Sequence, residues 1–371
     1  MSARFVSVLY ALGLVGAASL AACDPEKAPL EEGVEREELG TFTTDTGNAI
    51  TFDVSPPSDA VSALVYCGPY GYDMLATAES ITAPDGGSVY DLENPGATAM
   101  RVDTHSDILP MLIPVSPDLG LVSGTYGFKV YFDTESPVSA TCTGVYRVQA
   151  VEAEPTIDLD FVFVGVDGIA PGLNAAEGES TLAAVVEEVG AAWGNAGLSI
   201  GTITYADFDG NVDDYTILDG DTELGTLLRT VSGDRRTVTF FFVQEITNNE
   251  GVTILGLAGG PPGLAAVGGT SKSGVVVTTA SFASDPSEIA RIMAHEGGHF
   301  LGLFHTTEKD GSQHDPLSDT PQCTTDTSGD GVFATNECEG TGADNLMFWT
   351  GANDGMSADQ GWVLARSAAT Y

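Results

Sequence analysis

The feature that most constrains this chain is an eleven-residue segment that reads His-Glu-Gly-Gly-His-Phe-Leu-Gly-Leu-Phe-His and runs from His295 to His305. Each residue of an α-helix advances about 100°, so a helix places His295 and His299 one turn apart on one face, where both imidazoles can bind one metal ion. Gly302 can adopt a positive φ, which allows the helix to end and the chain to turn back. His305 can then approach the same ion.

Three neutral imidazole nitrogens leave one corner of a zinc tetrahedron open for water, whose pKa falls toward neutrality on the metal. Glu296 lies next to the first histidine, and its carboxylate can reach that water, so it is the candidate general base. A bare HExxH string also occurs by chance as a surface feature of helices. However, the chain has only five histidines, and three of them fall in this segment. We therefore expect a catalytic zinc site with His295, His299 and His305 as ligands.

The pattern HExxHxxGxxH resembles the zinc signature of the metzincin metalloendopeptidases. Members of that family carry a methionine turn beneath the metal, and Met347 in Asp344–Trp349 is similar to its methionine. The stretches 305–307 (His-Thr-Thr) and 319–321 (Asp-Thr-Pro) are similar to a pattern of the pappalysin branch. Some metzincins place a tyrosine two residues after the methionine to stabilise the oxyanion. Here that position is Trp349, so the resemblance does not imply a tyrosine contribution.

The resemblance implies an α/β catalytic domain at residues 151–371, with a twisted mixed sheet, an active-site helix and a Met-turn. It also implies a zinc-dependent endopeptidase that hydrolyses extracellular or cell-surface proteins through a metal-activated water, with Glu296 as the base. An edge strand of the sheet would pair with the extended peptide substrate. The alternative is a surface-anchored binding or adhesion protein with a structural or vestigial zinc site. His314 is the spare histidine that could close such a site.

The first 22 residues combine a basic start at Arg4 with an apolar run from 5 to 20 and small residues before a cysteine. This is typical of a secretion signal, and the run is too short and wrongly flanked for a membrane-spanning helix. Residues 20–23 (Leu-Ala-Ala-Cys) resemble the bacterial lipobox. We expect lipidated Cys23 to anchor the exported protein to a bacterial membrane or cell surface, as its one membrane attachment. Simple cleavage and release is the alternative. Residues 23–39, acidic and proline-containing, are expected to form a flexible tether.

Four cysteines remain after Cys23, an even number in an exported chain, and this predicts two disulfides. Proximity in the sequence favours Cys67 with Cys142 and Cys323 with Cys338. In an alternative, Cys67 silences the zinc as a latency thiolate, as in some metzincin prosegments, which would leave Cys142 unpaired.

Residues 40–150 are rich in glycine, threonine, serine and valine, with short alternating runs such as Tyr126–Phe132 between turn residues. This pattern predicts an all-β sandwich domain. His105 is isolated there, so we expect a surface or hydrogen-bonded histidine and not a ligand. The domain could serve as a spacer, a binding module or a prosegment. Across the chain, 13 basic against 53 acidic side chains give a formal net charge of −40, which repels phosphate backbones and argues against a nucleic-acid partner.

In residues 151–371, strands alternate with helical patterns, which favours a mixed α/β sheet. The active-site helix should begin at Asp285, an N-cap acceptor followed by Pro286 and the capping-box residue Glu288. Gly297 and Gly298 each cost this helix about 1 kcal/mol relative to alanine, so a neighbour is expected to require their small size. The other expected elements are strands at 157–164, 237–243 and 273–279, a helix at 180–196, and a flexible glycine-rich loop near the cleft at 256–269.

Two acidic segments suggest calcium sites. One follows the spacing of an EF-hand loop, which has oxygen ligands at positions 1, 3, 5 and 12 and a glycine at position 6. The ligand positions correspond to Asp326, Ser328, Asp330 and Glu337, and the glycine position to Gly331. Serine is a weak ligand and flanking helices are not evident, so an ordinary acidic loop held by Cys323 and Cys338 is an equal alternative. A weaker alternating pattern surrounds Gly210 and comprises Asp207, Asp209, Asn211 and Asp213.

Overall fold

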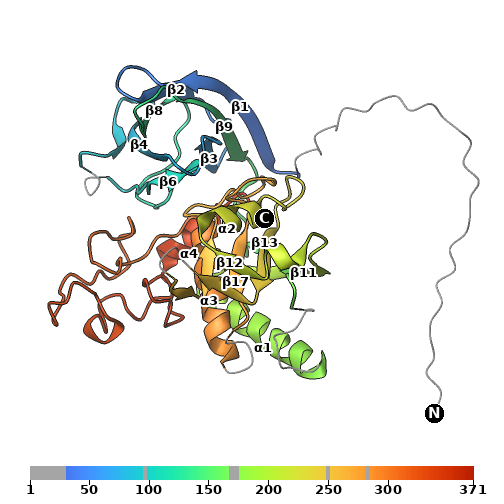
Figure 1. The fold of residues 1–371 in the computed structure, drawn as a ribbon. Helices are drawn as coiled ribbons and strands as arrows, with labels where there is room; N and C mark the ends of the chain where they lie inside the picture. Colours follow the sequence, from blue (N-terminus) through green and yellow to red (C-terminus); the bar gives the residue numbers. More distant parts are fainter. Residues whose placement is uncertain (1–30, 95–97, 167–174, 248–250, 281–284) are drawn as a thin grey trace, which may run out of the picture.

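The computed structural model describes residues 31–94, 98–166, 175–247, 251–280 and 285–371 (Figure 1). The predicted signal sequence, the lipidation site Cys23 and most of the predicted tether lie outside these residues. Among the helices that are described, none combines the length and the apolar character that crossing a bilayer requires.

Residues 34–147, which we call the N-terminal β region, form two antiparallel sheets (Figure 1). Their buried side chains belong to one hydrophobic cluster. Burial alternates along the strand Tyr126–Asp133, so one face of that strand lies in the core, as the period-two pattern predicted. One sheet has the order β1 (Val34–Thr43), β9 (Ser139–Arg147), β3 (Ser62–Cys67), β7 (Leu109–Ile113). The other has the order β2 (Ala49–Val54), β8 (Tyr126–Asp133), β4 (Leu75–Thr82), β5 (Ser88–Asp91), with β6 (His105–Ser106) paired to β4.

The described residues from 156 to 371 are called the C-terminal region. Its main sheet has the order β11 (Ser199–Asp207), β10 (Thr156–Phe163), β13 (Val238–Val243), β17 (Val275–Thr278), β16 (Gly256–Ala258). The first four strands are parallel, and β16 is antiparallel to β17 at the edge. A small sheet beside it contains β12 (Ile217–Asp219), β14 (Glu245–Thr247) and β15 (Thr253–Ile254). The sheet is therefore mixed, as predicted.

Two helices, α1 (Ala175–Gly194) and α3 (Pro286–Phe300), pack against each other beside this sheet (Figure 1). The indole Nε1 of Trp193 donates a hydrogen bond to the Ala294 carbonyl at 3.1 Å and joins the two helices. Trp193 is fully buried, as are Phe161 and Phe240 of the central strands. The remaining helices are α2 (Asp221–Leu228), α4 (Ala358–Leu364) and the short 3₁₀ turns η2 (Val212–Asp214) and η3 (Thr335–Glu337).

Two expected elements differ from the structure. The helix predicted at 180–196 begins earlier, at Ala175. The segment 256–269 is not a flexible loop, because its first three residues form β16 and the side chains of 264–267 are buried. A Cβ on Gly256 would lie 2.7 Å from Cγ2 of Ile292 and 2.8 Å from Cγ of Glu296. Glycine at this position therefore reflects the close approach of the edge strand to α3, and not the flexibility that the glycine-rich pattern suggested.

The two regions are joined by contacts of several kinds. The hydrophobic cluster of the N-terminal β region is continuous with that of the C-terminal region. Buried Asp107 accepts hydrogen bonds from Arg229 and from the Ser271 hydroxyl, the latter at 2.6 Å. The Arg36 guanidinium lies 2.8 Å from the Asp234 carboxylate. Together these contacts hold the N-terminal β region against the C-terminal region.

Candidate metal centre

The helix α3 begins and ends as its sequence predicts. The Asp285 carboxylate accepts a hydrogen bond from the Glu288 backbone N–H at 3.0 Å, and Pro286 occupies the first turn. The helix ends at Phe300, and Gly302 has a φ of +108°, a conformation that side-chain-bearing residues rarely adopt. A Cβ on Gly302 would also lie 2.5 Å from Cδ2 of Leu112 in the N-terminal β region. The turn thus needs glycine for two reasons, and it leads the chain back to His305.

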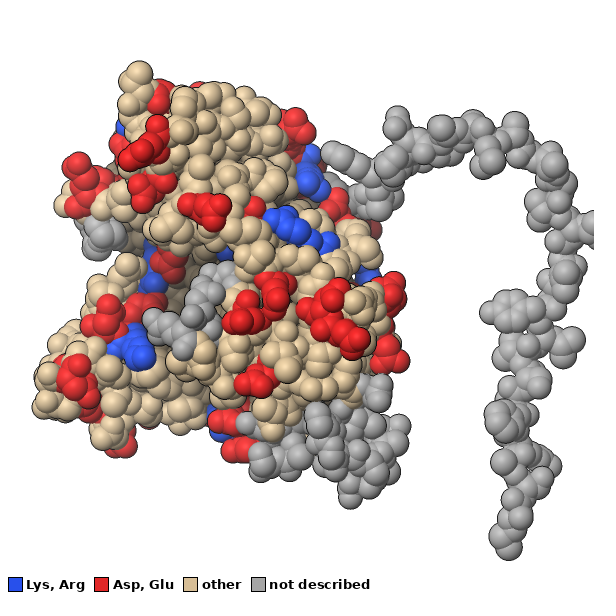
Figure 2. All heavy atoms as spheres, in the orientation of Figure 1, with Lys and Arg blue, Asp and Glu red and all other residues tan. Residues whose placement is uncertain are grey.

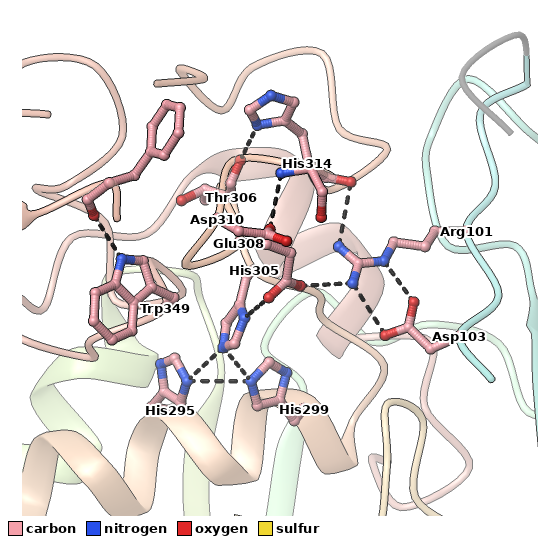
Figure 3. A network of polar contacts seen from close by, with 12 residues as sticks. Arg101, Asp103, His295, His299, His305, Thr306, Glu308, Asp310, His314 and Trp349 are labelled. Atoms are coloured by element: carbon pink, nitrogen blue, oxygen red, sulfur yellow. Dashed lines mark hydrogen bonds and ion pairs between the residues drawn. The ribbon is translucent and has the colours of Figure 1, made fainter. Parts of the chain in front are cut away.

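The structure brings the three predicted histidines together. The Nε2 atoms of His295 and His299 are 3.1 Å apart, those of His295 and His305 are 3.2 Å apart, and those of His299 and His305 are 3.0 Å apart (Figure 3). Each Nδ1 atom faces a separate acceptor. Nδ1 of His295 lies 2.7 Å from the Leu346 carbonyl, and Nδ1 of His299 lies 2.8 Å from the Leu303 carbonyl. Nδ1 of His305 lies 2.7 Å from the Glu308 carboxylate.

This arrangement suits a cation. Because each Nδ1 faces an oxygen acceptor, the proton of each neutral ring resides on Nδ1, and three Nε2 lone pairs converge on one point. Nitrogen ligands about 2.0–2.1 Å from a tetrahedral zinc ion lie about 3.3 Å from one another, close to the observed separations. Within the described ranges, these histidines are the sole group of three or more His, Cys, Asp or Glu side chains positioned to hold a metal.

Burial favours the neutral form of His295 and His299. It lowers the pKa of His295 to about 4, with a further contribution from the neighbouring His305. Burial likewise holds the pKa of His299 well below its ordinary value, aided by the other two histidines. Both rings are therefore neutral at pH 7 before any metal binds, which is the state that a metal ligand requires.

Glu296 follows the first histidine and lines the same cleft. Burial raises the pKa of its carboxyl to about 7, while a hydrogen bond from the Ala258 backbone opposes the shift. A carboxyl with a pKa near neutrality can both accept and return a proton at physiological pH. A cation bound at the three histidines would lower this pKa, since it favours the charged form.

Two residues that support the histidines were not predicted from the sequence. Glu308 connects His305 to Arg101, which also binds Asp103 (Figure 3). Burial alone would raise the pKa of Glu308, but its hydrogen bond to His305 and the charge of Arg101 hold it at about 2. The spacing of three residues from His305 to Glu308 is a local signal that could have identified the carboxylate. No signal in the sequence indicated Arg101, which lies 207 positions away.

Met347 lies fully buried against α3. A Cβ on Gly298 would lie 2.7 Å from its Sδ, which explains why this helical position is glycine. The Met347 carbonyl accepts a hydrogen bond from the Thr306 N–H at 2.9 Å, and the Met347 N–H donates to the Asn345 side chain at 2.8 Å. Trp349, two residues on, lines the cleft and donates from its indole to the Phe333 carbonyl at 2.7 Å (Figure 3).

A cleft of about 1310 Å³ opens in front of the histidines, and both regions line it. The C-terminal region contributes Leu257 and Ala258 of the edge strand β16, and the N-terminal β region contributes Tyr90, Met100 and Arg101. Figure 2 shows the molecular surface hollowed between the two regions, with acidic side chains distributed over both and few basic ones. A substrate in this cleft would contact both regions.

The calcium prediction finds no support. The two carboxylate oxygens of Asp326 accept hydrogen bonds from the backbone N–H groups of Gly329 at 2.6 Å and Gly331 at 2.8 Å. One Glu337 oxygen accepts from the Ser328 N–H at 2.7 Å. In neither predicted loop do three acidic side chains converge, as far as the described residues extend. The EF-hand-like spacing corresponds to carboxylates that stabilise their own loop backbone.

Both predicted disulfides are present, Cys67–Cys142 and Cys323–Cys338. The first joins register partners on the adjacent strands β3 and β9, so the idea that Cys67 silences the metal as a latency thiolate is wrong. His314 does not join the metal centre, because its Nδ1 lies 3.0 Å from the Thr306 carbonyl and the ring is directed away from the three histidines (Figure 3).

Comparison with known proteins shows what the segment that carries this site is similar to. Residues 241–364, about a third of the chain, match the model of peptidase family M43, described as pregnancy-associated plasma protein-A. No curated protein matches the chain. Among solved structures, metalloproteinase-II from Bacteroides fragilis is 19% identical with a TM-score of 0.29, over 46% of this chain and 51% of that chain. A chaperone–substrate complex is 16% identical with a TM-score of 0.27, over 46% of this chain and 29% of that chain. The chain thus spans about half the length of the first structure.

Proposed function

We propose that this chain, with the metzincin-like peptidase segment that the family M43 match identifies, is a zinc-dependent endopeptidase that cleaves extracellular or cell-surface proteins. The observation that carries the proposal is the convergence of three Nε2 atoms at 3.0–3.2 Å, each ring held by an acceptor at its other nitrogen. Among the described residues, no fourth His, Cys, Asp or Glu joins the three histidines. Three protein ligands are typical of catalytic zinc sites, whereas structural zinc sites usually have four. The same observation argues against the alternative of a binding or adhesion protein with a closed, structural site.

The chain's own side chains divide the work of peptide hydrolysis. When bound, zinc supplies a Lewis acid for the scissile carbonyl and lowers the pKa of the attacking water. Glu296, which lines the same cleft, would accept a proton from the attacking water and return it to the leaving amine. His295, His299 and His305 would provide the nitrogen ligands.

The edge strand β16 supports a mode of substrate binding. It is antiparallel to β17, it forms the last strand of the sheet, and its Leu257 and Ala258 line the cleft. An extended peptide can add to such an edge through main-chain hydrogen bonds. We propose that the substrate backbone pairs with β16 and that its scissile bond lies over the histidines. Met347, packed against α3, corresponds in this proposal to the Met-turn residue.

Export and lipid anchoring complete the proposal. The apolar run before Cys23 and the lipobox-like residues 20–23 support secretion and lipidation. Two disulfides in the structure favour an oxidising compartment. Mass spectrometry of the mature protein tests this part: a first residue Cys23 carrying acyl chains is expected, and an unmodified N-terminus further along the chain would contradict it.

The catalytic proposal is tested with full-length protein and the variant Glu296→Gln, which keeps the shape of the side chain and removes its basicity. We expect one zinc ion per chain in both proteins, and a loss of peptide cleavage in the variant of about 10²–10⁴-fold. The matched control is Glu288→Gln, at the start of the same helix, which should retain activity. Cleavage of a fluorogenic peptide library should stop with a chelator and return with zinc.

Three outcomes would contradict parts of the proposal. If the wild-type chain binds no zinc, the metal centre is wrong. If Glu296→Gln cleaves at the wild-type rate, Glu296 is not the base. If the wild-type chain binds zinc but cleaves no peptide, the binding-protein alternative is favoured.

A further inference from the structure

The environment of Arg101 points to a role in the metal centre. This residue lies in the N-terminal β region, between β5 and β6, and its side chain is 11% exposed. Its Nε and Nη2 atoms donate to the two carboxylate oxygens of Asp103 at 2.7 and 3.0 Å. Its guanidinium also lies over the Phe304 ring, 4.8 Å from the centroid. Two hydrogen bonds to one carboxylate and a stacked ring fix the plane of the guanidinium.

The same guanidinium reaches Glu308 in the C-terminal region. Nη2 of Arg101 donates to Oε1 of Glu308 at 2.6 Å, and Oε2 of Glu308 accepts from Nδ1 of His305 at 2.7 Å (Figure 3). Glu308 thus uses one oxygen for each partner. The result is a continuous chain of contacts from a strand connection in the N-terminal β region to the third histidine.

His305 differs from the other two histidines in how it is held. His295 and His299 donate to backbone carbonyls, of Leu346 and Leu303, which are fixed by the fold of the C-terminal region itself. His305 depends on a side chain that is 25% exposed. A partly exposed glutamate has several rotamers open to it, so a second contact is needed to keep its carboxylate in one place.

We infer that Arg101 is a positioning residue of the metal centre, which through Glu308 fixes the ring orientation and tautomer of His305. The inference rests on the proposed function, since it assigns His305 as a zinc ligand. Partners of ligating histidines typically change metal affinity by about 10–100-fold when they are removed. The N-terminal β region accordingly contributes a side chain that supports the metal centre.

The experiment measures the zinc dissociation constant of full-length variants by competition with a chromophoric chelator. Arg101→Met removes the guanidinium and keeps an apolar stem of similar length, and Glu308→Gln removes the carboxylate. We expect each to weaken zinc binding by about 10–100-fold. Because Arg101 acts through Glu308, the double variant should bind zinc no more weakly than Glu308→Gln. Arg101→Lys, which keeps the charge, should recover part of the loss.

The matched control is Arg36→Met. Arg36 also forms an ion pair between the two regions, with Asp234, but neither residue lines the cleft. Zinc affinity should stay within about twofold of the wild-type value. Urea unfolding of the metal-free proteins reports separately on how much each substitution destabilises the fold.

Two outcomes would overturn the inference. If Arg101→Met binds zinc as tightly as the wild-type chain and only unfolds more easily, Arg101 is a structural tie between the regions. If zinc affinity is unchanged and KM alone rises, Arg101 contacts the substrate directly. An absence of zinc binding by the wild-type chain is a different result, because it refutes the proposed function itself.

Discussion

Gly297 lies directly against Trp193, so that a Cβ added to Gly297 would be 2.5 Å from Cζ2 of the indole ring. Trp193 is fully buried and its Nε1 is hydrogen-bonded to the Ala294 carbonyl, so the ring cannot move aside without losing that bond. The glycine that weakens α3 as an isolated helix is what allows α3 to pack closely against α1.

This contact predicts the effect of Gly297→Ala. Overpacking costs about 1–3 kcal/mol, and the better helix propensity of alanine returns about 1 kcal/mol, so we expect a net loss of up to about 2 kcal/mol in the free energy of unfolding. Urea unfolding of the variant and the wild-type protein measures this difference in the free energy of unfolding. The control is Gly190→Ala in α1, where the nearest atom to an added Cβ is 3.6 Å away and alanine should stabilise. A stabilised Gly297→Ala variant would contradict the packing argument.

Gly256→Ala should damage catalysis without removing the metal. The added Cβ would lie 2.8 Å from Cγ of Glu296 and would push either the edge strand or the candidate base out of position. A misplacement of about 1 Å can cost about 100-fold in rate, so we expect kcat to fall by about 10–100-fold while zinc content stays at the wild-type level. Gly120→Ala, with open space around the added Cβ, is the control. Unchanged kcat in Gly256→Ala would show that Glu296 tolerates movement of β16.

His105 predicts a dependence of stability on pH. Its Nε2 lies 3.2 Å from the Pro261 carbonyl, and burial, with the charge of Lys272, lowers its pKa from 6.5 to about 3. Between pH 6.5 and about pH 3, His105 carries a proton in the unfolded chain and not in the folded chain. The stabilising contribution is therefore complete above pH 6.5 and is lost as the pH falls toward 3, by up to about 1.4 kcal/mol per pH unit.

The variant His105→Gln can keep a hydrogen bond to the Pro261 carbonyl and cannot titrate. Its free energy of unfolding should depend less steeply on pH than that of the wild-type protein between pH 6 and 4, by up to about 1.4 kcal/mol per pH unit. Urea unfolding of both metal-free proteins across this range measures the difference. If the two proteins showed the same dependence on pH, the folded chain would protonate His105 as readily as the unfolded chain, and folding would not lower the pKa of His105.

The disulfide Cys323–Cys338 should stabilise the rim of the cleft. It closes a loop with a sequence separation of 15 and belongs to a buried cluster with Phe348, against which Trp349 packs. Closing a loop of this length stabilises a protein by about 3 kcal/mol in the chain-entropy model. We expect the double variant Cys323→Ala, Cys338→Ala to unfold more easily by up to that amount, and its tryptophan fluorescence to change. An unchanged urea midpoint would contradict the prediction.

The candidate site could be predicted where its geometry is local. The spacing of His295 and His299 on one helix, the capping residues at its start and the glycine at its end specify where the first two ligands lie. The turn after Gly302 is short, so His305 could be placed as well. Both disulfide pairings also followed from closeness in the sequence.

The same local reasoning does not decide between alternatives where a pattern has two meanings. Alternating acidic residues at 326–337 can surround a cation or bind their own backbone, and the spacing is the same in both cases. Glycines at 256–269 can mark flexibility or close packing, and only the neighbouring helix distinguishes them. Such patterns stay ambiguous because a sequence pattern does not contain the partner atoms.

By itself the sequence determined the chemistry of this protein: which side chains converge on a metal, which carboxylate stands beside them, and how the helix that carries them begins and ends. The tertiary structure decided what supports that chemistry, namely the edge strand over Glu296, the indole against Gly297 and the contact of Arg101 with Glu308. The physical reason is the range of the interactions. Helical spacing and capping act over a few residues, whereas Arg101 and Glu308, 207 positions apart in the chain, meet only because the two regions pack together.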